Sequence, residues 1–200
     1  YMRGYRFAKI CPSITRYSFD AYSGQGRLDI ALAMMDGKLS YTPRLLDIIY
    51  ECPLCGACDT MCKRCVDLEV LSVLEALRIK CVEDGKGPMS EHKELAENVE
   101  KTNNIYGETH NKRLEWMPKG IKPAKKADIV YFVGCAPAYR QPEIARATVE
   151  ILNAAGSEFM VMHPDEWCCG SPLYSTGQIG LTRKLMEHNL KAIQNSGASK

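Results

Sequence analysis

The sequence has no run of roughly 18 or more apolar residues, the length that a membrane-spanning helix needs. Its first residues, YMRGYRFAKICPS, are basic but lack the apolar core of a signal peptide. An excess of charge of one sign is also missing, because the formal net charge is only +2. Charge therefore indicates neither nucleic acid nor lipid as a partner. We expect a cytoplasmic protein that has no membrane span of its own and reaches a membrane only through a partner subunit.

The composition is otherwise that of a globular protein, with 46% apolar and 25% charged residues. Two hundred residues are enough for one or two domains with a hydrophobic core. The chain begins at Tyr1 rather than at a methionine, and it stops at "GASK", where a further strand is expected. The sequence thus predicts additional residues before Tyr1 and either additional residues after residue 200 or partner strands from another chain.

Cysteine is what the sequence has in excess, with ten in 200 residues. Five of them lie within residues 51–65, in the stretch ECPLCGACDTMCKRC. Clustered cysteines in a chain without a secretion signal are typical of metal binding, whereas disulfides are typical of small secreted domains. We therefore expect metal ligation rather than disulfide bonds.

The first four cysteines of this stretch have the spacing C-x2-C-x2-C-x3-C and are Cys52, Cys55, Cys58 and Cys62. This is the run that holds cubane [4Fe–4S] clusters in bacterial ferredoxins. Three closely spaced thiolates hold three corners of the cube, and the fourth corner needs a sulfur from elsewhere. Zinc usually takes separated C-x2-C pairs rather than a triplet. The spacing predicts one cubane cluster; a zinc-stabilised scaffold without redox activity is the rival interpretation.

The fourth ligand follows from the two-cluster ferredoxins, in which the last cysteine of each run binds the cluster of the other run and usually precedes a proline. Cys11 is followed by Pro12, as such a ligand would be. The predicted cubane ligands are Cys11, Cys52, Cys55 and Cys58.

The same rule would assign Cys62 to an upstream triplet, but the corresponding positions are Tyr1, Gly4 and Phe7. That cluster cannot form, so Cys62, which is followed by Lys63 instead of proline, is left without a metal. Cys65 has no place in either set. In the competing assignment, Cys62 completes its own triplet and Cys11 is free.

Helices are predicted for most of the first half of the chain. Residues 16–50 are helical in pattern, broken at "YSGQG", and include a buried helix that ends near Gly37. Its apolar residues are Leu28, Ile30, Leu32 and Met35. A strong helix follows in "DLEVLSVLEALRIKCVEDG", whose apolar face consists of Val70, Leu74, Leu77 and Cys81. This spacing makes Cys81 a core residue rather than a ligand. A further helical piece is expected around "HKELAENVEKT".

The pattern changes after residues 117–127, which are rich in proline and lysine and indicate a linker. Their lysines suit a solvated segment, or a docking site for an acidic partner. "DIVYFV", residues 128–133, predicts a strand buried on both faces. A helix at about 142–155, the strand "EFMVM" and a helix ending at Gly197 follow. This alternation predicts a parallel sheet.

We therefore expect a multidomain α+β protein. Residues 1–116 form a mostly helical ferredoxin-like module, residues 117–127 a linker, and residues 128–200 the first part of an α/β domain whose parallel sheet is incomplete.

A second group of cysteines lies in this last part: Cys135, and the pair Cys168 and Cys169, separated from it by 32 residues. Cys135 is expected to end one buried strand, and the pair follows the next strand. Both would lie at the carboxyl end of a parallel sheet, where ligands bind in open α/β folds. Gly170 would let the backbone approach closely. Buried free cysteines with a chance adjacent pair are the alternative.

The spacing C-x32-CCG resembles the first part of the CCG cysteine-rich domain, whose full motif ends in a later C-x2-C. This domain occurs in heterodisulfide reductases and their relatives. A ferredoxin-like run followed by a CCG domain resembles the D-type subunit of these enzymes. The chain departs from that pattern in three places: the first cubane triplet, the proline after the fourth cysteine of the run, and the final C-x2-C are missing.

The resemblance implies that Cys135, Cys168 and Cys169 are catalytic and hold a non-cubane [4Fe–4S] cluster completed by residues outside this chain. It implies an oxidoreductase subunit of anaerobic metabolism that reduces or oxidises a small disulfide or thiol substrate. Electrons would come through the cubane from other redox subunits, with a flavin, an iron–sulfur centre or a membrane cytochrome. The alternative is pure electron transfer from a soluble donor to a quinone or membrane cytochrome.

Three further residues flank the second cysteine group. His163 is a candidate proton donor or an ordinary surface-loop histidine. Tyr139 and Arg140 either line the mouth of the site or belong to an exposed loop.

Overall fold

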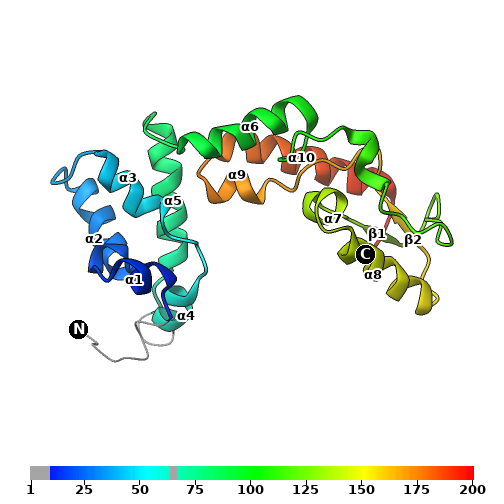
Figure 1. Ribbon diagram of the computed structural model, residues 1–200, viewed down its shortest axis with the longest axis horizontal. Helices are drawn as coiled ribbons and strands as arrows, with labels where there is room; N and C mark the ends of the chain where they lie inside the picture. The colour runs from blue at the N-terminus through cyan, green and yellow to red at the C-terminus, as the bar shows by residue number, and fades with distance from the viewer. Residues whose placement is uncertain (1–9, 64–66) are drawn as a thin grey trace. The chain divides into compact units, whose positions relative to one another are not determined.

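The computed structural model describes residues 10–63 and 67–200, which form two compact units (Figure 1). Unit 1 comprises the described residues up to Ser90 together with Tyr174–Gln178, and unit 2 comprises Glu91–Leu173 and Ile179–Lys200. Tyr1, Gly4 and Phe7, which stand where an upstream ferredoxin run would have cysteines, lie outside the described residues, as does Cys65.

Unit 1 consists of short helices. They are α1 (Pro12–Tyr17), the 3-10 helix η1 (Asp20–Tyr22), α2 (Gly24–Met35), α3 (Pro43–Tyr50), α4 (Ala57–Lys63) and α5 (Val70–Glu83). Side-chain caps determine where two of them begin. The hydroxyl of Ser23 accepts a hydrogen bond from the Gly26 amide, and that of Thr42 from the Leu45 amide. Each bond satisfies an amide that the helix itself leaves unpaired.

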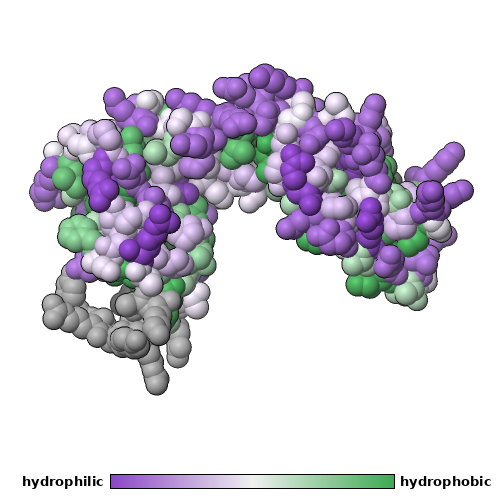
Figure 2. Space-filling model, viewed as in Figure 1, coloured by the Kyte–Doolittle hydropathy of each residue, from purple (hydrophilic) through white to green (hydrophobic). Residues whose placement is uncertain are grey.

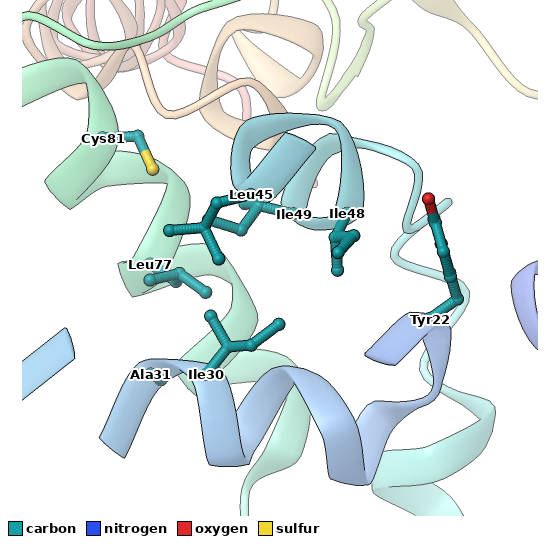
Figure 3. Packing of buried hydrophobic residues seen from close by; sticks show 8 residues of the cluster. All are labelled: Tyr22, Ile30, Ala31, Leu45, Ile48, Ile49, Leu77 and Cys81. Carbon is teal, nitrogen blue, oxygen red and sulfur yellow. The ribbon is translucent and has the colours of Figure 1, made fainter. Parts of the chain in front are cut away.

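The core of unit 1 lies between α2, α3 and α5 (Figure 3). In Figure 3 the aliphatic side chains of the three helices face a common space, and Tyr22 of η1 stands at its edge beside Ile48. The buried residues of this core are Tyr22, Ile30, Ala31, Leu45, Ile48, Ile49, Leu77 and Cys81. The predicted apolar face of α5 is confirmed, and the Cys81 side chain is fully buried.

The predicted burial of two residues of α2 is wrong. Leu32 and Met35 are 59% and 86% exposed rather than buried. The buried side of α2 is formed by Arg27, Ile30 and Ala31, which follow the helical spacing i, i+3, i+4. The predicted break at "YSGQG" is confirmed, because Ser23 within this stretch separates η1 from α2 and caps the start of α2.

Unit 2 contains both strands and most of the later helices. Its elements are α6 (Ser90–Thr102), η2 (His110–Leu114), β1 (Ile129–Tyr131), α7 (Cys135–Tyr139), α8 (Pro142–Ala154), β2 (Phe159–Val161) and α10 (Ile179–Ser196). The short helix α9 (Ser171–Ser175) precedes α10. The predicted helices at "HKELAENVEKT", at 142–155 and up to Gly197 are confirmed.

The sheet has two parallel strands in the described residues, with Ile129 opposite Phe159 and Tyr131 opposite Val161. Parallel pairing agrees with the sequence, but β1 is shorter than "DIVYFV" and only half-buried, so the expectation of a strand covered on both faces is wrong. The amide of Val130 donates to the carbonyl of Lys200 on the side of β1 away from β2. The last residue thus pairs with the sheet as a neighbouring strand would.

Residues 117–127, predicted as a linker, pack within unit 2. The Ala124 amide donates to the Phe159 carbonyl at 2.8 Å, and Met117 and Ile121 contact a core cluster that contains Trp116. The cluster includes side chains from β1, β2 and α8.

The surface turned to the viewer in Figure 2 is mostly hydrophilic on each unit, and hydrophobic residues occur there in small separate patches. Within the described residues, every helix is too short or too polar to cross a membrane.

Candidate metal centres

The first centre is a pocket in unit 1 at the start of α4. The chain leaves α3 at Tyr50 and turns twice into left-handed backbone, at Leu54 (φ +51°) and Gly56 (φ +71°), before α4 begins at Ala57. Glycine favours this conformation and leucine does not. The turn brings the sulfur-bearing side chains of the cysteine run together instead of along one extended strand.

All four predicted cubane ligands line this one pocket. Cys11 immediately precedes α1, at the N-cap position, and joins the pocket from elsewhere in the chain. The cysteines that line it are Cys11, Cys52, Cys55 and Cys58, together with Gly24, Leu71, Leu74 and residues 53, 54, 56 and 57. Cys62 lies one turn after Cys58 on α4 and is absent from the pocket lining within the described residues.

Gly24 allows the start of α2 to lie against the cysteine run. A Cβ atom at this position would lie 2.8 Å from the Cβ and 3.0 Å from the Sγ of Cys58. Both distances are too short for a side chain to be accommodated without movement. The glycine at the first position of α2 therefore has a packing reason.

The donor set suits an iron–sulfur cluster, because thiolates in apolar surroundings are the ligands that such clusters take. The pocket is narrow, with a volume of about 20 Å³, so a cluster would enter by moving the side chains at its rim, where Cys55 is exposed. Among the described residues, no three Cys, His, Asp or Glu side chains are arranged to hold a single metal ion. Burial raises the pKa of the Cys58 thiol, so a metal must displace its proton.

Two buried arginines fix the backbone around this pocket. Arg78 on α5 donates to the carbonyls of Ile49 (3.2 Å), Tyr50 (3.1 Å) and Cys52. Arg27 on α2 donates to the carbonyl of Ile48 at 2.7 Å. The carbonyls of residues 48–50 belong to the end of α3, where helix geometry leaves them without partners, and that of Cys52 lies in the cysteine run itself. The two guanidinium groups thereby hold the chain at the point where the cysteine run begins.

The second centre lies in unit 2 and joins the other three predicted cysteines. Cys135 and Cys168 are buried in one cluster with Val99, Leu173 and Leu185, while Cys169 is exposed. The prediction that Cys135 ends a strand is wrong. Strand β1 ends at Tyr131, and Cys135 is the first residue of α7. The chain reaches α7 through Gly134, whose φ of +80° suits glycine.

Three hydrogen bonds fix Cys168, two through its backbone and one through its sulfur. Its amide donates to the Asn103 carbonyl (2.8 Å), its carbonyl accepts from the Asn189 amide group (2.9 Å), and its sulfur accepts from the Gly170 amide (3.5 Å). Gly170 has φ +84°, and a Cβ there would lie 3.1 Å from Cγ2 of Thr182. A side chain at this position would therefore press against Thr182 of α10.

A buried ion pair supports the same site. Arg113 and Glu166 are 2.9 Å apart, and each side chain is 1% exposed. Glu166 also accepts hydrogen bonds from the amides of Val133 (2.9 Å) and Gly134 (2.8 Å), just before Cys135. Both terminal nitrogens of Arg113 lie 3.9 Å from the Cys135 sulfur, and one donates to the Trp167 carbonyl. The pair thus connects the two cysteine-bearing segments.

The three thiols have different acidities. A hydrogen bond from the Cys168 thiol lowers the pKa of Cys135, and the charge of Arg113 contributes in the same direction. The same hydrogen bond raises the pKa of Cys168 to about 11, and a bond with Cys168, together with burial, raises that of Cys169. Cys135 is therefore the thiol of the group that loses its proton first.

The flanking residues differ in their relation to this centre. The Tyr139 hydroxyl lies 3.5 Å from a terminal nitrogen of Arg113, whereas Arg140 is exposed and pairs with Glu108 at 2.9 Å. His163 is half-buried and stacks on His110, with ring centroids 5.3 Å apart. Its buried Nε2 has no hydrogen-bond partner among the described residues.

Sequence reasoning missed the four buried charged residues of the two centres, Arg27, Arg78, Arg113 and Glu166. A signal existed for Arg78, which immediately follows Leu77 of the apolar face that the sequence predicts for α5. The others have partners far along the chain, and local periodicity does not reveal such partners.

Comparison with known proteins adds an independent finding. Residues 129–200 match the family model described as "CCG: Cysteine-rich domain". The chain is 38% identical over 157 residues to the D-type subunit of the dihydromethanophenazine:CoB–CoM heterodisulfide reductase of Methanosarcina barkeri, with 77% of this chain and 38% of the relative covered. It is 30% identical to the B-type subunit of the fumarate reductase (CoM/CoB) of Methanothermobacter marburgensis, covering 73% and 29%.

A third relative is the EtfAB:quinone oxidoreductase of Syntrophomonas wolfei, 25% identical with 83% of this chain and 24% of the relative covered. The chain thus spans well under half the length of the curated relatives it matches. No solved structure matches the chain.

Proposed function

The chain is a homologue of the D-type subunit of heterodisulfide reductase and carries a CCG cysteine-rich domain, and on this premise we propose that it is an iron–sulfur subunit of such an oxidoreductase. It would take electrons from a partner redox subunit and deliver them to an acceptor at the second cysteine centre. In this proposal the ferredoxin-like module lies within residues 1–116, of which Glu91 onward pack in unit 2, residues 117–127 follow it, and residues 128–200 begin the CCG domain.

The first centre would hold one cubane [4Fe–4S] cluster, which transfers single electrons. The proposed ligands are Cys11, Cys52, Cys55 and Cys58. The observation that supports this half of the proposal is the single pocket that these four side chains line, although Cys11 is about forty residues from the others. Leu71 and Leu74 keep the inner side of that pocket apolar.

The second centre would hold a non-cubane cluster through Cys135, Cys168 and Cys169, with further ligands outside residues 1–200. When bound, this cluster would supply the electrons that cleave the sulfur–sulfur bond of a small disulfide, or accept them when two thiols are joined. Cleavage of one disulfide consumes two electrons and two protons and yields two thiols. The exposed Cys169 would lie on the side that such a substrate reaches.

The residues of unit 2 prepare this site in three ways. Glu166 fixes the backbone before Cys135 through two amide hydrogen bonds. Arg113 places positive charge beside the Cys135 sulfur and favours its thiolate, the form that binds metal. Burial of Cys135 and Cys168 keeps water from two of the three sulfurs.

A second candidate function is electron transfer without disulfide chemistry, toward a quinone or a membrane cytochrome. The name of the Syntrophomonas wolfei relative, a quinone oxidoreductase, favours this alternative. Both functions require partner subunits, which would carry a flavin, an iron–sulfur centre or a cytochrome.

The two functions differ in the acceptor that oxidises the reduced protein. The test uses the whole protein, purified without oxygen and reduced chemically, to which either a disulfide of two small thiols or a short-chain quinone is added. Oxidation of the protein by the disulfide, with release of thiols, and loss of this reaction in Cys169→Ser are expected. Oxidation by the quinone alone would favour the second function, and a colourless protein containing zinc but no iron would overturn both.

A further inference from the structure

Unit 1 buries two arginines that have no acidic partner. Arg27 is 1% and Arg78 5% exposed, and their hydrogen bonds go to backbone carbonyls and to one hydroxyl. Among the described residues neither forms an ion pair with a carboxylate, and residues 1–9 and 64–66 contain no Asp or Glu. Arg113 of unit 2, by contrast, has its counter-charge in Glu166.

Two unpaired cations in one small core are costly, because burial removes them from water without an opposite charge nearby. Removal from water lowers the pKa of Arg78, and the charge of Arg27 contributes in the same direction. The Nε of Arg78 is buried without a hydrogen-bond partner among the described residues. The rings of Tyr50 and Tyr22 below the guanidiniums provide only a weak attraction.

Both arginines are bonded to segments that carry cysteines of the first centre. Arg78 donates to the carbonyl of Cys52 itself. Arg27 donates to the Tyr22 carbonyl, the same oxygen that lies 3.8 Å from the sulfur of Cys11. Arg27 also lies 3.4 Å from the hydroxyl of Ser13, two residues after Cys11. Each cation thus bonds to the backbone of one segment that carries or contacts a cysteine of the pocket.

We propose that Arg27 and Arg78 are the counter-charges of an anionic iron–sulfur cluster bound by Cys11, Cys52, Cys55 and Cys58, and that they raise its reduction potential. Four thiolates give such a cluster a net negative charge, and reduction adds one electron and no proton. Fixed positive charge nearby stabilises the reduced state more than the oxidised state. The inference rests on the proposed function and adds to it two positioning residues that make this centre a better electron acceptor.

The test measures the reduction potential of the first centre by an EPR-monitored redox titration of the whole, cluster-containing protein. Arg78→Gln and Arg27→Gln each remove one buried positive charge, and both should shift the potential to more negative values. Lys80→Gln is the matched control, because Lys80 lies on the same helix and its side chain is 60% exposed. Water and salt screen that charge, so the control should shift the potential much less.

Arg78→Lys separates charge from shape, since lysine keeps the positive charge but loses the forked hydrogen bonds. The proposal requires Arg78→Lys to stay nearer the wild-type potential than Arg78→Gln. Should Arg78→Gln fail to retain iron, retention of iron by Arg78→Lys at a near wild-type potential would support the same role of charge.

Three results would overturn the inference. They are a wild-type potential in both glutamine variants, a shift no larger than that of Lys80→Gln, and equal loss of iron in the lysine and glutamine variants of Arg78. Absence of any iron–sulfur signal in the wild-type protein would be a different result, because it would refute the proposed function itself.

Discussion

Both terminal nitrogens of Arg113 lie 3.9 Å from the sulfur of Cys135, and the same guanidinium is paired with the buried Glu166. Arg113, which lies in η2, thereby connects the Cys135 sulfur at the start of α7 with the loop that contains Glu166 and the cysteine pair. Removing either member of the ion pair would leave the other charged and buried, which is among the more destabilising changes that a single substitution makes.

We predict that Arg113→Met lowers the free energy of unfolding by about 3–5 kcal/mol, because it leaves the Glu166 carboxylate without its partner. The double variant Arg113→Met/Glu166→Gln should lose less than the sum of the two single variants, since the second change removes the stranded charge. Chemical denaturation of all four proteins checks this. Strictly additive losses would mean that the pair does not act as a unit.

The second prediction concerns metal content. The whole protein, purified without oxygen, should contain iron and acid-labile sulfide and show a broad absorption at about 400 nm that bleaches on reduction. Metal analysis and absorption spectra measure this. Stoichiometric zinc in place of iron would contradict the assignment of both centres.

The third prediction distinguishes the two assignments of the fourth cubane ligand. Cys11→Ser should lose or damage the cubane, because Cys11 lines the pocket with the triplet Cys52, Cys55 and Cys58. Cys62→Ser is the matched control and should keep the cluster. Iron counted in each variant, with the EPR signal of the reduced cubane, gives the answer, and the reverse pattern would establish Cys62 as the ligand.

The fourth prediction concerns the second centre. Cys168→Ser or Cys169→Ser should abolish disulfide-linked turnover while the cubane remains reducible, because the two groups of cysteines belong to different compact units. Turnover assays and EPR spectra of the same samples separate the two effects. Loss of the cubane signal in either variant would refute the independence of the centres.

The fifth prediction uses the close approach of Gly24 to the cysteine run. Gly24→Ala should reduce iron bound at the first centre, since the new methyl group would lie 2.8 Å from the Cβ of Cys58 and push that residue away. Gly180→Ala, whose added Cβ would meet nothing within 4 Å, should bind iron as the wild type does. Equal iron in both variants would show that the run adapts to the methyl group.

Local pattern was enough to predict much of the secondary structure. The face of α5, including the burial of Cys81, follows from the helical spacing of apolar residues, and the parallel pairing of β1 and β2 follows from the strand–helix alternation. The prediction for α2 was wrong because it used the apolar character of the residues and not their helical spacing. Leu32 and Met35 are apolar, yet the buried side of that helix includes Arg27 and excludes both of them.

What the sequence could not predict depends on partners distant in the chain. Glu166 is 53 residues from Arg113, and the backbone oxygens held by Arg78 belong to another helix. Charged residues are usually exposed, so residue type alone predicts a solvent-exposed position for these arginines and for Glu166. The C-x2-C-x2-C-x3-C spacing, by contrast, let the sequence predict a shared location for Cys52, Cys55 and Cys58, because it needs only a tight turn.

The hydroxyl of Ser13 donates to the carbonyl of Glu51 at 2.7 Å, across a separation of 38 residues. Ser13 lies two residues after Cys11 and Glu51 immediately precedes Cys52, so this bond joins the two cysteine-bearing segments through protein atoms, without any metal. Closing a loop of that length costs conformational entropy, and here folding of unit 1 has already closed it. In the proposed cluster site the four thiols would therefore act as one multidentate chelator rather than as two separate donors, and the affinity for the cluster would benefit from this preorganisation.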